Sequence, residues 1–381
     1  MRKRTKFLGV LLAATMMATA GPAVAQKITV MTAGDQNMVD YVNEYLAPKF
    51  EAANPGVTVE AVGTGPGDAG SQMIFERFSA QAGAGAEGDV DVAVVHQKMA
   101  GQMVEEKLLA SYRGEIETGD LVSRDTADMA LGTDVHGYVM PMFHSQTAIA
   151  YNPELVPNPP KTYDELVAWA KEHPGQFGYN GIKGGMSGVS FVMGWMYAYT
   201  DDAQQMMNGP FDAGISDDWD QALAKLKDFN ANVVFTPGNA GTLDMLNRGE
   251  IATGPVWVDM FYTWQSDGRL SPDLKLVLIG PGMPGQPMYY VVPANAPNKE
   301  LAEKFVALAT GPDVQAEGIV KRFNWYPGID AEHVQSKLDP ETWSKLFTDV
   351  TPEDLAEKGK PFPIAPYFDA ILESYERQVT N

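Results

Sequence analysis

The sequence predicts an α/β protein that is divided into two lobes. Short apolar runs alternate with segments of helical periodicity along most of the chain, and this alternation is typical of a mainly parallel sheet with helices on both faces. The 381 residues exceed what a single hydrophobic core normally organises. No low-complexity linker interrupts the chain, so we expect strands or short loops to join the lobes.

The individual elements are predicted from periodicity and from the residues that end each run. Strands are expected where apolar residues run together and stop at Gly, Pro or Asp. Helices are expected where apolar residues recur every three or four positions. The predicted strands are 27–31, 57–62, 91–95, 251–254, 274–279 and 289–293, and the predicted helices are 39–52, 71–81, 99–106, 162–173, 218–229, 243–248 and 299–309.

The amino terminus carries the three parts of a secretory signal peptide. Four basic residues lie within the first six positions, an apolar run follows, and Ala23-Val-Ala25 supplies small residues at the −3 and −1 positions of a cleavage site. The apolar run is too short to span a bilayer comfortably. We therefore expect residues 1–25 to be removed, so that the mature protein begins at Gln26 in the periplasm.

The composition argues against binding to nucleic acid or to anionic lipid. The chain has 28 basic and 49 acidic side chains, and loss of the four basic residues of the signal leaves a formal charge of −25. A surface of that sign repels phosphate-rich partners. The chain has no cysteine, so it has neither disulfides nor an acceptor for a lipid anchor. We expect a freely diffusing, monomeric periplasmic protein that carries no cofactor.

Three segments resemble the extracellular solute-binding proteins of ABC importers, in particular the family that includes the maltose-binding protein. In 151–166, Tyr-Asn is followed by a short loop, Pro-Pro-Lys-Thr and an aromatic residue that leads into a helix. In 249–257, Gly-Glu precedes an apolar strand with an aromatic residue just after Gly-Pro. In 296–317, a helix is followed by a Gly-Pro-Asp turn. These elements follow the family's order over 28–368.

The resemblance implies a periplasmic-binding-protein type II fold, with two α/β lobes and a ligand cleft between them. By analogy, the first lobe is 26–142 plus 281–320 and the second is 143–280 plus 321–381. Parallel sheets bind ligands at the carboxyl ends of their strands, so two facing sheets would surround one cleft that closes on its ligand. The implied partners are a small-molecule ligand and the permease subunits of the transporter in the membrane.

Polar side chains near the predicted strand ends and crossings are the first candidates for ligand contact. Asp35 follows the first strand, where it could bind ligand hydroxyls or cap a helix. Histidine at a strand end is compatible with a binding role, although a lone histidine is more often structural. The candidates of this group are Asp35 and Gln36 after the first strand, His96 and Gln97 after the third, and His144 and Ser145 at the first crossing between lobes.

Aromatic side chains form the second group of candidates. Trp257 is the residue expected to stack on the ligand, because an indole face packs on the C–H groups of a sugar or on a cation. Ordinary core packing is the alternative for every member of this group. The other candidates are Trp195, then Trp325 and Tyr326, which follow the third crossing between lobes at 320–321, and Tyr367, which is expected at the rim of the cleft.

The ligand is expected to be a sugar, an oligosaccharide or a polyol, because aromatic and neutral polar residues dominate the candidate loops. The acidic chain leaves a cationic ligand, such as a polyamine or a thiamine-like compound, as an alternative. Tyr289 and Tyr290, with His96 and Asp35, leave a ferric-ion site as another. No HExxH, GxSxG or CxxC motif is present, so we expect no enzymatic activity. A secreted glycoside hydrolase, which needs two positioned carboxylates, is the remaining alternative.

Overall fold

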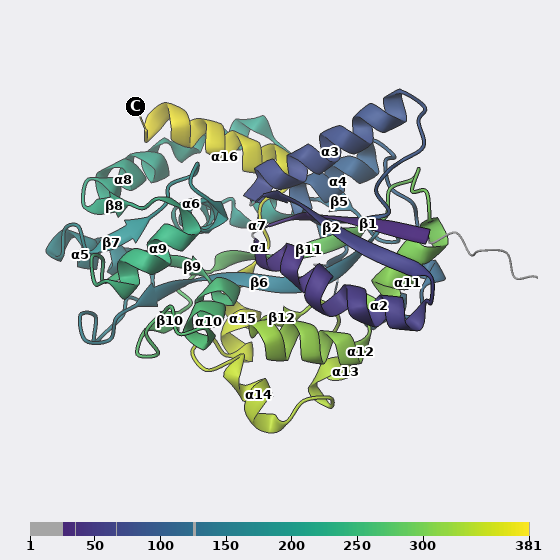
Figure 1. The fold of residues 1–381 in the computed structure, drawn as a ribbon. Coiled ribbons are helices and arrows are strands. Elements are labelled where there is room, and N and C mark those ends of the chain that lie inside the picture. Colours follow the sequence, from purple (N-terminus) through teal and green to yellow (C-terminus); the bar gives the residue numbers. More distant parts are fainter. Residues whose placement is uncertain (1–25, 35, 66, 125–126, 381) are drawn as a thin grey trace, which may run out of the picture.

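The computed structural model describes residues 26–34, 36–65, 67–124 and 127–380 (Figure 1). Within these residues, eleven strands form one mixed sheet in the order β2-β1-β3-β11-β6-β9-β7-β8, with β10 and β12 paired to β6 and β13 paired to β11. The bounds are β1 Gln26–Ala33, β2 Val57–Gly65, β3 Val92–His96, β6 Val139–Tyr151, β7 Phe177–Tyr179, β8 Val233–Phe235, β9 Thr253–Trp257, β10 Lys275–Val277, β11 Met283–Val291, β12 Tyr326–Pro327 and β13 Gly359–Lys360.

The sheet has two parallel halves. Strands β2, β1 and β3 run parallel at one end, and β9, β7 and β8 run parallel at the other. We call these the β3 half and the β9 half. The helices of the β3 half are α1 Gln36–Asp40, α2 Ala47–Ala53, α3 Gly67–Gly83, α4 Gln97–Glu105 and α11 Lys299–Ala309 (Figure 1). Those of the β9 half are α5 Tyr163–Glu172, α6 Met186–Tyr199, α8 Asp220–Asn230, α9 Gly238–Asn247, α10 Val258–Ser266 and α16 Ala365–Gln378.

Two strands, β6 and β11, lie between the two halves and bring the two sets of strand ends together. Strand β6 has 13 residues and pairs with β11 and then with β9. Met288 of β11 lies opposite both His96 and Phe143, so the carboxyl end of β3 is level with the middle of β6. The carboxyl end of β9 meets the same strand four residues further on, because Trp257 lies opposite Thr147.

A third segment packs beside the crossing strands. It contains α12 Pro312–Val314, a π-helical turn at Gln315–Lys321, α13 Ala331–Gln335, α14 Pro340–Lys345 and α15 Pro352–Lys358. Strand β12 of this segment pairs with β6 at His144 and Phe143. The segment therefore covers the crossing strands (Figure 1).

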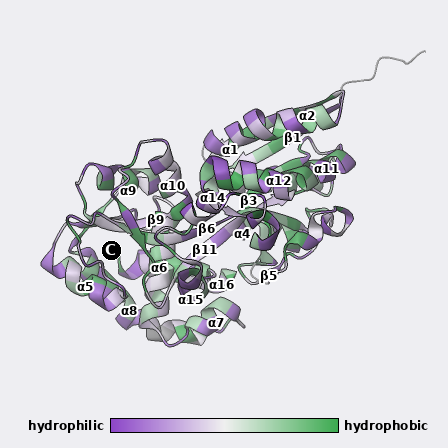
Figure 2. Cartoon of the chain, turned by 90° about the horizontal axis from the view of Figure 1, so that it is seen from below, coloured by the Kyte–Doolittle hydropathy of each residue, from purple (hydrophilic) through white to green (hydrophobic). Residues whose placement is uncertain are grey.

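The helices follow the sequence pattern. In Figure 2 the outer helices carry hydrophilic and hydrophobic residues in alternation, as helices with one buried face do. Helix α6 is different, because every residue from Met186 to Tyr197 is buried, and a helix that is apolar all round packs inside a protein. Within the described part of the chain, no helix combines the length and the apolar character needed to cross a membrane.

Most predicted elements have a counterpart in the structure, whereas β7, β8, α6 and α10 were not predicted, and neither was the strand at the crossing. The helix expected at 299–309 is α11 at the same bounds, and the strands expected at 27–31, 57–62 and 91–95 are β1, β2 and β3. Strand β6 was not predicted, since polar residues interrupt its apolar pattern at the crossing. Strand β11 begins six residues before the expected 289, since prolines and a glycine at its start disfavour a strand prediction.

Candidate functional site

Two pockets lie against the crossing strands, and neighbouring residues of one strand line different pockets. Phe143 and Ser145 of β6 line the first, which we call the front pocket. His144 and Gln146 line the second, which we call the rear pocket. Successive side chains of a strand point to opposite faces, so the crossing strands separate the two pockets. On β11, Gln286 and Met288 line the front pocket, and Gly285 and Pro287 line the rear pocket.

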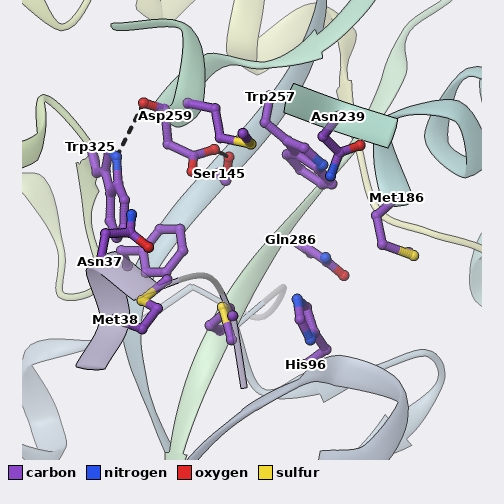
Figure 3. Close-up of a pocket in the computed structure, with 14 residues that line it drawn as sticks. Asn37, Met38, His96, Ser145, Met186, Asn239, Trp257, Asp259, Gln286 and Trp325 are labelled. Carbon is purple, nitrogen blue, oxygen red and sulfur yellow. Dashed lines mark hydrogen bonds between the residues drawn. The ribbon is translucent and has the colours of Figure 1, made fainter. Parts of the chain in front are cut away.

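The front pocket lies where the strand ends of both halves meet. It encloses about 620 Å³, its open mouth included. The carboxyl ends of parallel strands are the usual place for ligands in α/β sheets, and β1, β3 and β9 all contribute here. The lining residues are Gly34, Asn37, Met38, His96, Phe143, Ser145, Met186, Asn239, Trp257, Asp259, Met260, Gln286, Met288 and Trp325 (Figure 3).

Asp259 gives the front pocket its charge. It is the only charged side chain among the described residues that line this pocket. It lies in the first turn of α10, directly after β9. The Ser145 hydroxyl donates a hydrogen bond to its carboxylate, and the Trp325 indole N–H donates to its backbone oxygen at 3.2 Å. Asp259 thus supplies the carboxylate of the pocket and also helps to hold Trp325, which forms one aromatic wall.

Two indole rings lie on either side of Asp259 in Figure 3. Trp325 is 1 % exposed, stacks on Phe323 at a centroid distance of 4.3 Å and contacts Phe143 at the same distance. Its orientation is therefore fixed by packing as well as by its hydrogen bonds. Trp257 is 6 % exposed at the end of β9. Indole faces in this position can pack on C–H groups or attract a cation.

His96 forms the opposite wall, at the end of β3. Ser71 Oγ lies 3.0 Å from His96 Nδ1 and accepts the backbone N–H of His96 at 3.0 Å. When the Ser71 hydroxyl donates to Nδ1, the neutral ring carries its proton on Nε2. Burial lowers the pKa of His96, and the nearby Asp68 carboxylate acts in the opposite direction. A neutral imidazole at pH 7 follows, so Asp259 is not offset by a histidine cation.

The rear pocket has the opposite charge. It encloses about 1,170 Å³, its open mouth included, and is lined mainly by apolar residues of 326–361. Its charged lining residues, among those described, are Arg124 and Lys360. Burial, and secondarily the charge of Arg124, lower the pKa of His144 to about 4, so this ring is neutral at pH 7. We take the front pocket as the candidate ligand site, because the strand ends of both halves meet there.

The structure divides the predicted site residues between the two pockets. Three adjacent pairs, His96 and Gln97, His144 and Ser145, and Trp325 and Tyr326, have one member at each pocket, although both members of each pair were expected at one cleft. For His144 and Ser145 of β6 the physical cause is the reversal of side-chain direction from one residue to the next in a strand, whereas the other two pairs lie where an element begins, at α4 and at β12. His96, Ser145, Trp257 and Trp325 line the front pocket, whereas Gln97, His144 and Tyr326 line the rear pocket.

Three further candidates lie on neither pocket wall, and Asp35 lies outside the described residues. Trp195 is fully buried in α6, and its indole N–H donates to the backbone oxygen of Ala222 at 2.9 Å. Tyr367 is fully buried, and its hydroxyl accepts the backbone N–H of Asp212 at 2.7 Å. Both are therefore core residues. Gln36 is exposed, and its amide donates to the Asp40 carboxylate at 2.9 Å.

The tyrosine pair considered for ferric ion is also buried. Tyr289 and Tyr290 are 0 % exposed in β11, and the Tyr289 hydroxyl donates to the backbone oxygen of Ala127 at 2.9 Å. Neither residue lines the front pocket. Among the residues that the structure describes, no group of three or more His, Cys, Asp or Glu side chains could hold a metal ion.

Several front-pocket residues were missed by sequence reasoning. Asp259 could have been found, because it lies two residues beyond a strand end that already carried the candidate Trp257. Asn239 follows β8, whose three residues gave no prediction. Gln286 lies on the unpredicted start of β11. Position relative to strand ends is the common signal, and it is visible only once the strands are placed correctly.

Comparison with known proteins gives a family and a fold. The family described as bacterial extracellular solute-binding protein matches residues 46–331, about three quarters of the chain. A gamma-aminobutyric acid-binding protein from Pseudomonas aeruginosa is 30% identical over 95 residues, which cover 25% of this chain and 26% of that protein. The chain thus spans about a quarter of the length of this relative.

Solved structures resemble almost the whole chain. The spermidine/putrescine ABC transporter substrate-binding protein PotD from Streptococcus pneumoniae has a TM-score of 0.69 at 15% identity, over 93% of this chain and 98% of the other. An ABC transporter solute-binding protein from Thermotoga lettingae, bound to alpha-D-tagatose, has a TM-score of 0.70 at 18% identity, over 93% and 94%. The predicted type II periplasmic-binding-protein fold is thereby confirmed.

Proposed function

The chain belongs to the bacterial extracellular solute-binding proteins, and from this premise we propose that it delivers a small solute with a primary amine to an ABC importer. The amine is the specific part of the proposal. Asp259 carries it, as the only charged side chain among the described residues of the front pocket. A carboxylate in a partly buried site favours a cation, because charges interact more strongly there than in water.

The ring of Trp257 supports a cationic ligand as well, whereas Trp325 is 1 % exposed and packs on Phe323 and Phe143. Trp257 and Trp325 lie on either side of Asp259 (Figure 3). An ammonium over an indole face is attracted by the ring quadrupole, with a stabilisation of about 0.5–2 kcal/mol. The net charge of the whole chain is −21, which raises the local concentration of cations and their association rate. The Asp259 carboxylate, the Trp257 ring and the net charge all favour a cationic ligand.

A sugar or polyol is the second candidate. Asn37, Asn239 and Gln286 present neutral amide groups to the front pocket, and amides are suited to bind hydroxyl groups. The ligands named for the similar proteins include both amines and a sugar, namely a polyamine, gamma-aminobutyric acid and a ketose. We favour the amine because a partly buried carboxylate attracts an ammonium more strongly than a neutral hydroxyl group.

We infer that the protein works by closure of its two lobes. The lobes are 26–142 plus 281–320 and 143–280 plus 321–381, joined at the crossing strands. The front pocket takes His96 from the β3 half and Trp257 and Asp259 from the β9 half. A ligand that contacts both halves at once stabilises the closed arrangement by its differential affinity. The permease would recognise that arrangement.

Export is the remaining part of the proposal. Residues 1–25, the predicted signal peptide, lie outside the described residues. The mature protein would act in the periplasm as a soluble monomer. Mass spectrometry of protein from that compartment is expected to find Gln26 at the amino terminus. Retention of Met1 in a membrane fraction would contradict export by cleavage.

The amine is tested by calorimetry with two ligand panels, one of primary amines and one of neutral sugars and polyols. We expect an amine to bind, and to be recovered unchanged. In Asp259→Asn, which keeps the shape of the side chain, the affinity for that amine should fall about 30-fold or more, as when a charged partner is removed. Binding of a neutral sugar that is unaffected by Asp259→Asn would overturn the proposal in favour of the second candidate.

A further inference from the structure

Asn239 presents hydrogen-bond donors to the front pocket, and its orientation is fixed. Its side-chain oxygen accepts from the Asn180 amide at 2.7 Å, the Ser187 hydroxyl at 2.8 Å and the Ser187 backbone N–H at 3.3 Å. A backbone N–H can only donate. The oxygen of the amide must therefore face Ser187, and the NH₂ group must face the other way.

The NH₂ group lies on the pocket side. Asn239 lines the front pocket, and in Figure 3 its nitrogen lies toward Gln286 while its oxygen lies away from it. Among the described residues, no hydrogen-bond acceptor on the protein is found for this nitrogen. Two N–H donors are thus available to whatever occupies that end of the pocket.

The local backbone is built to keep Asn239 in this position. Gly185 precedes α6 with a φ of +149°, a conformation that L side chains rarely adopt, and a Cβ on it would lie 2.5 Å from the Asn239 oxygen. Ser187 is in the first turn of the same helix. The positive end of the helix therefore lies against the amide oxygen of Asn239. This strengthens the donors on its far side, because hydrogen bonds in a chain polarise one another.

The front pocket therefore has an acceptor end and a donor end. Asp259 marks the first and Asn239 the second, and in Figure 3 they lie on either side of Trp257. Given the proposed function, on which this inference rests, the amine of the ligand binds at Asp259. We infer that the ligand carries an oxygen acceptor, either a hydroxyl or a carboxylate, at its other end. A simple diamine is disfavoured, because its second ammonium would meet N–H donors.

The test is a comparison of three matched ligands that differ only at the end remote from the amine. They are an α,ω-diamine, an ω-amino alcohol and an ω-amino acid, each taken at several chain lengths. For the native protein, calorimetry is expected to show at least tenfold tighter binding of the amino alcohol or the amino acid than of the diamine. Which of these two binds tighter decides between hydroxyl and carboxylate.

A single substitution should reverse the preference. Asn239→Asp keeps an oxygen toward Ser187 and Asn180 and places a carboxylate oxygen where the donors were. The diamine should then bind at least tenfold tighter than either oxygen-bearing ligand. Asn208→Asp adds the same charge at an exposed position outside the pocket and should leave the native preference unchanged. Thermal melting of each variant checks that it is folded.

Two results would overturn the inference. One is a native protein that prefers the diamine. The other is a folded Asn239→Asp variant with an unchanged order of affinities. Failure of every amine to bind is a different result, because it would refute the proposed function itself and the inference with it.

Discussion

The front and rear pockets share the strands β6 and β11, yet they have opposite chemistry. The described lining of the front pocket carries one acidic side chain, Asp259, and no lysine or arginine. The described lining of the rear pocket carries Arg124 and Lys360 and no acidic side chain. Arg124 pairs with Asp330 at 2.7 Å, and Lys360 donates to the backbone oxygen of Glu357 at 2.6 Å.

The comparison shows that the alternation of side-chain direction along a strand decides which side chains can contact a ligand. The front pocket collects the ends of parallel strands, whereas the rear pocket is closed mainly by 326–361. Its two cations are engaged by neighbouring groups of the protein. We therefore expect substitutions at the front to change affinity and substitutions at the rear to change stability.

The largest effect is expected from two neighbouring residues of β6. Ser145→Leu fills the front pocket and removes the hydroxyl that donates to Asp259, so the affinity for the amine should fall about 100-fold or more. His144→Leu changes the adjacent residue, which faces the rear pocket and is neutral at pH 7. Calorimetry should find its affinity within about threefold of the native value. Equal losses in both variants would refute the separation of the pockets.

A smaller effect is expected from the aromatic residues. Trp257→Ala removes an indole face from the front pocket and should weaken binding by about 1–3 kcal/mol, roughly 5–150-fold. The matched variant Trp343→Ala removes an indole ring from the rear pocket. Its affinity should be unchanged, while its melting temperature falls because packing is lost. An unchanged affinity in folded Trp257→Ala would assign Trp257 to core packing.

The smallest effect is a dependence on pH that differs between the two histidines. The pKa of His144 is about 4 in the folded protein, below the ordinary value of about 6.5. Between these values the unfolded chain binds more protons, so the free energy of unfolding should decrease by about 1–3 kcal/mol as the pH falls from about 6.5 to about 4. Denaturant titration at several pH values measures this, and His144→Gln should reduce the decrease.

His96 should affect binding instead. Its pKa is also lowered by burial, and protonation would place a positive charge in the pocket that holds the ammonium. The affinity for an amine should therefore decrease a few-fold as His96 becomes protonated below neutral pH. His96→Gln should remove that part of the decrease in calorimetry, with no change in the stability profile assigned to His144. The reverse pattern would exchange the roles of the two residues.

The fold was largely predictable, and the site only in part. The helix at 299–309 and the first three strands follow from periodicity. The site prediction expected residues 144 and 145 at one cleft, because these residues can be assigned to opposite faces only if the segment is known to be a strand. The burial of Trp195 was missed for a different reason, since helix α6 was not predicted, and the burial of α6 on every side explains its place in the core.

The shared strand β6 also sets a rule for how this protein can vary. Substitutions at its centre alter one pocket at a time, because neighbouring side chains belong to different faces. An insertion or deletion of one residue there would instead exchange the two sets, since a one-residue shift turns every side chain of a strand to the other face. Ser145 would move to the rear and His144 to the front. Variants with altered ligands are therefore expected to keep the length of this strand, with length changes confined to the loops.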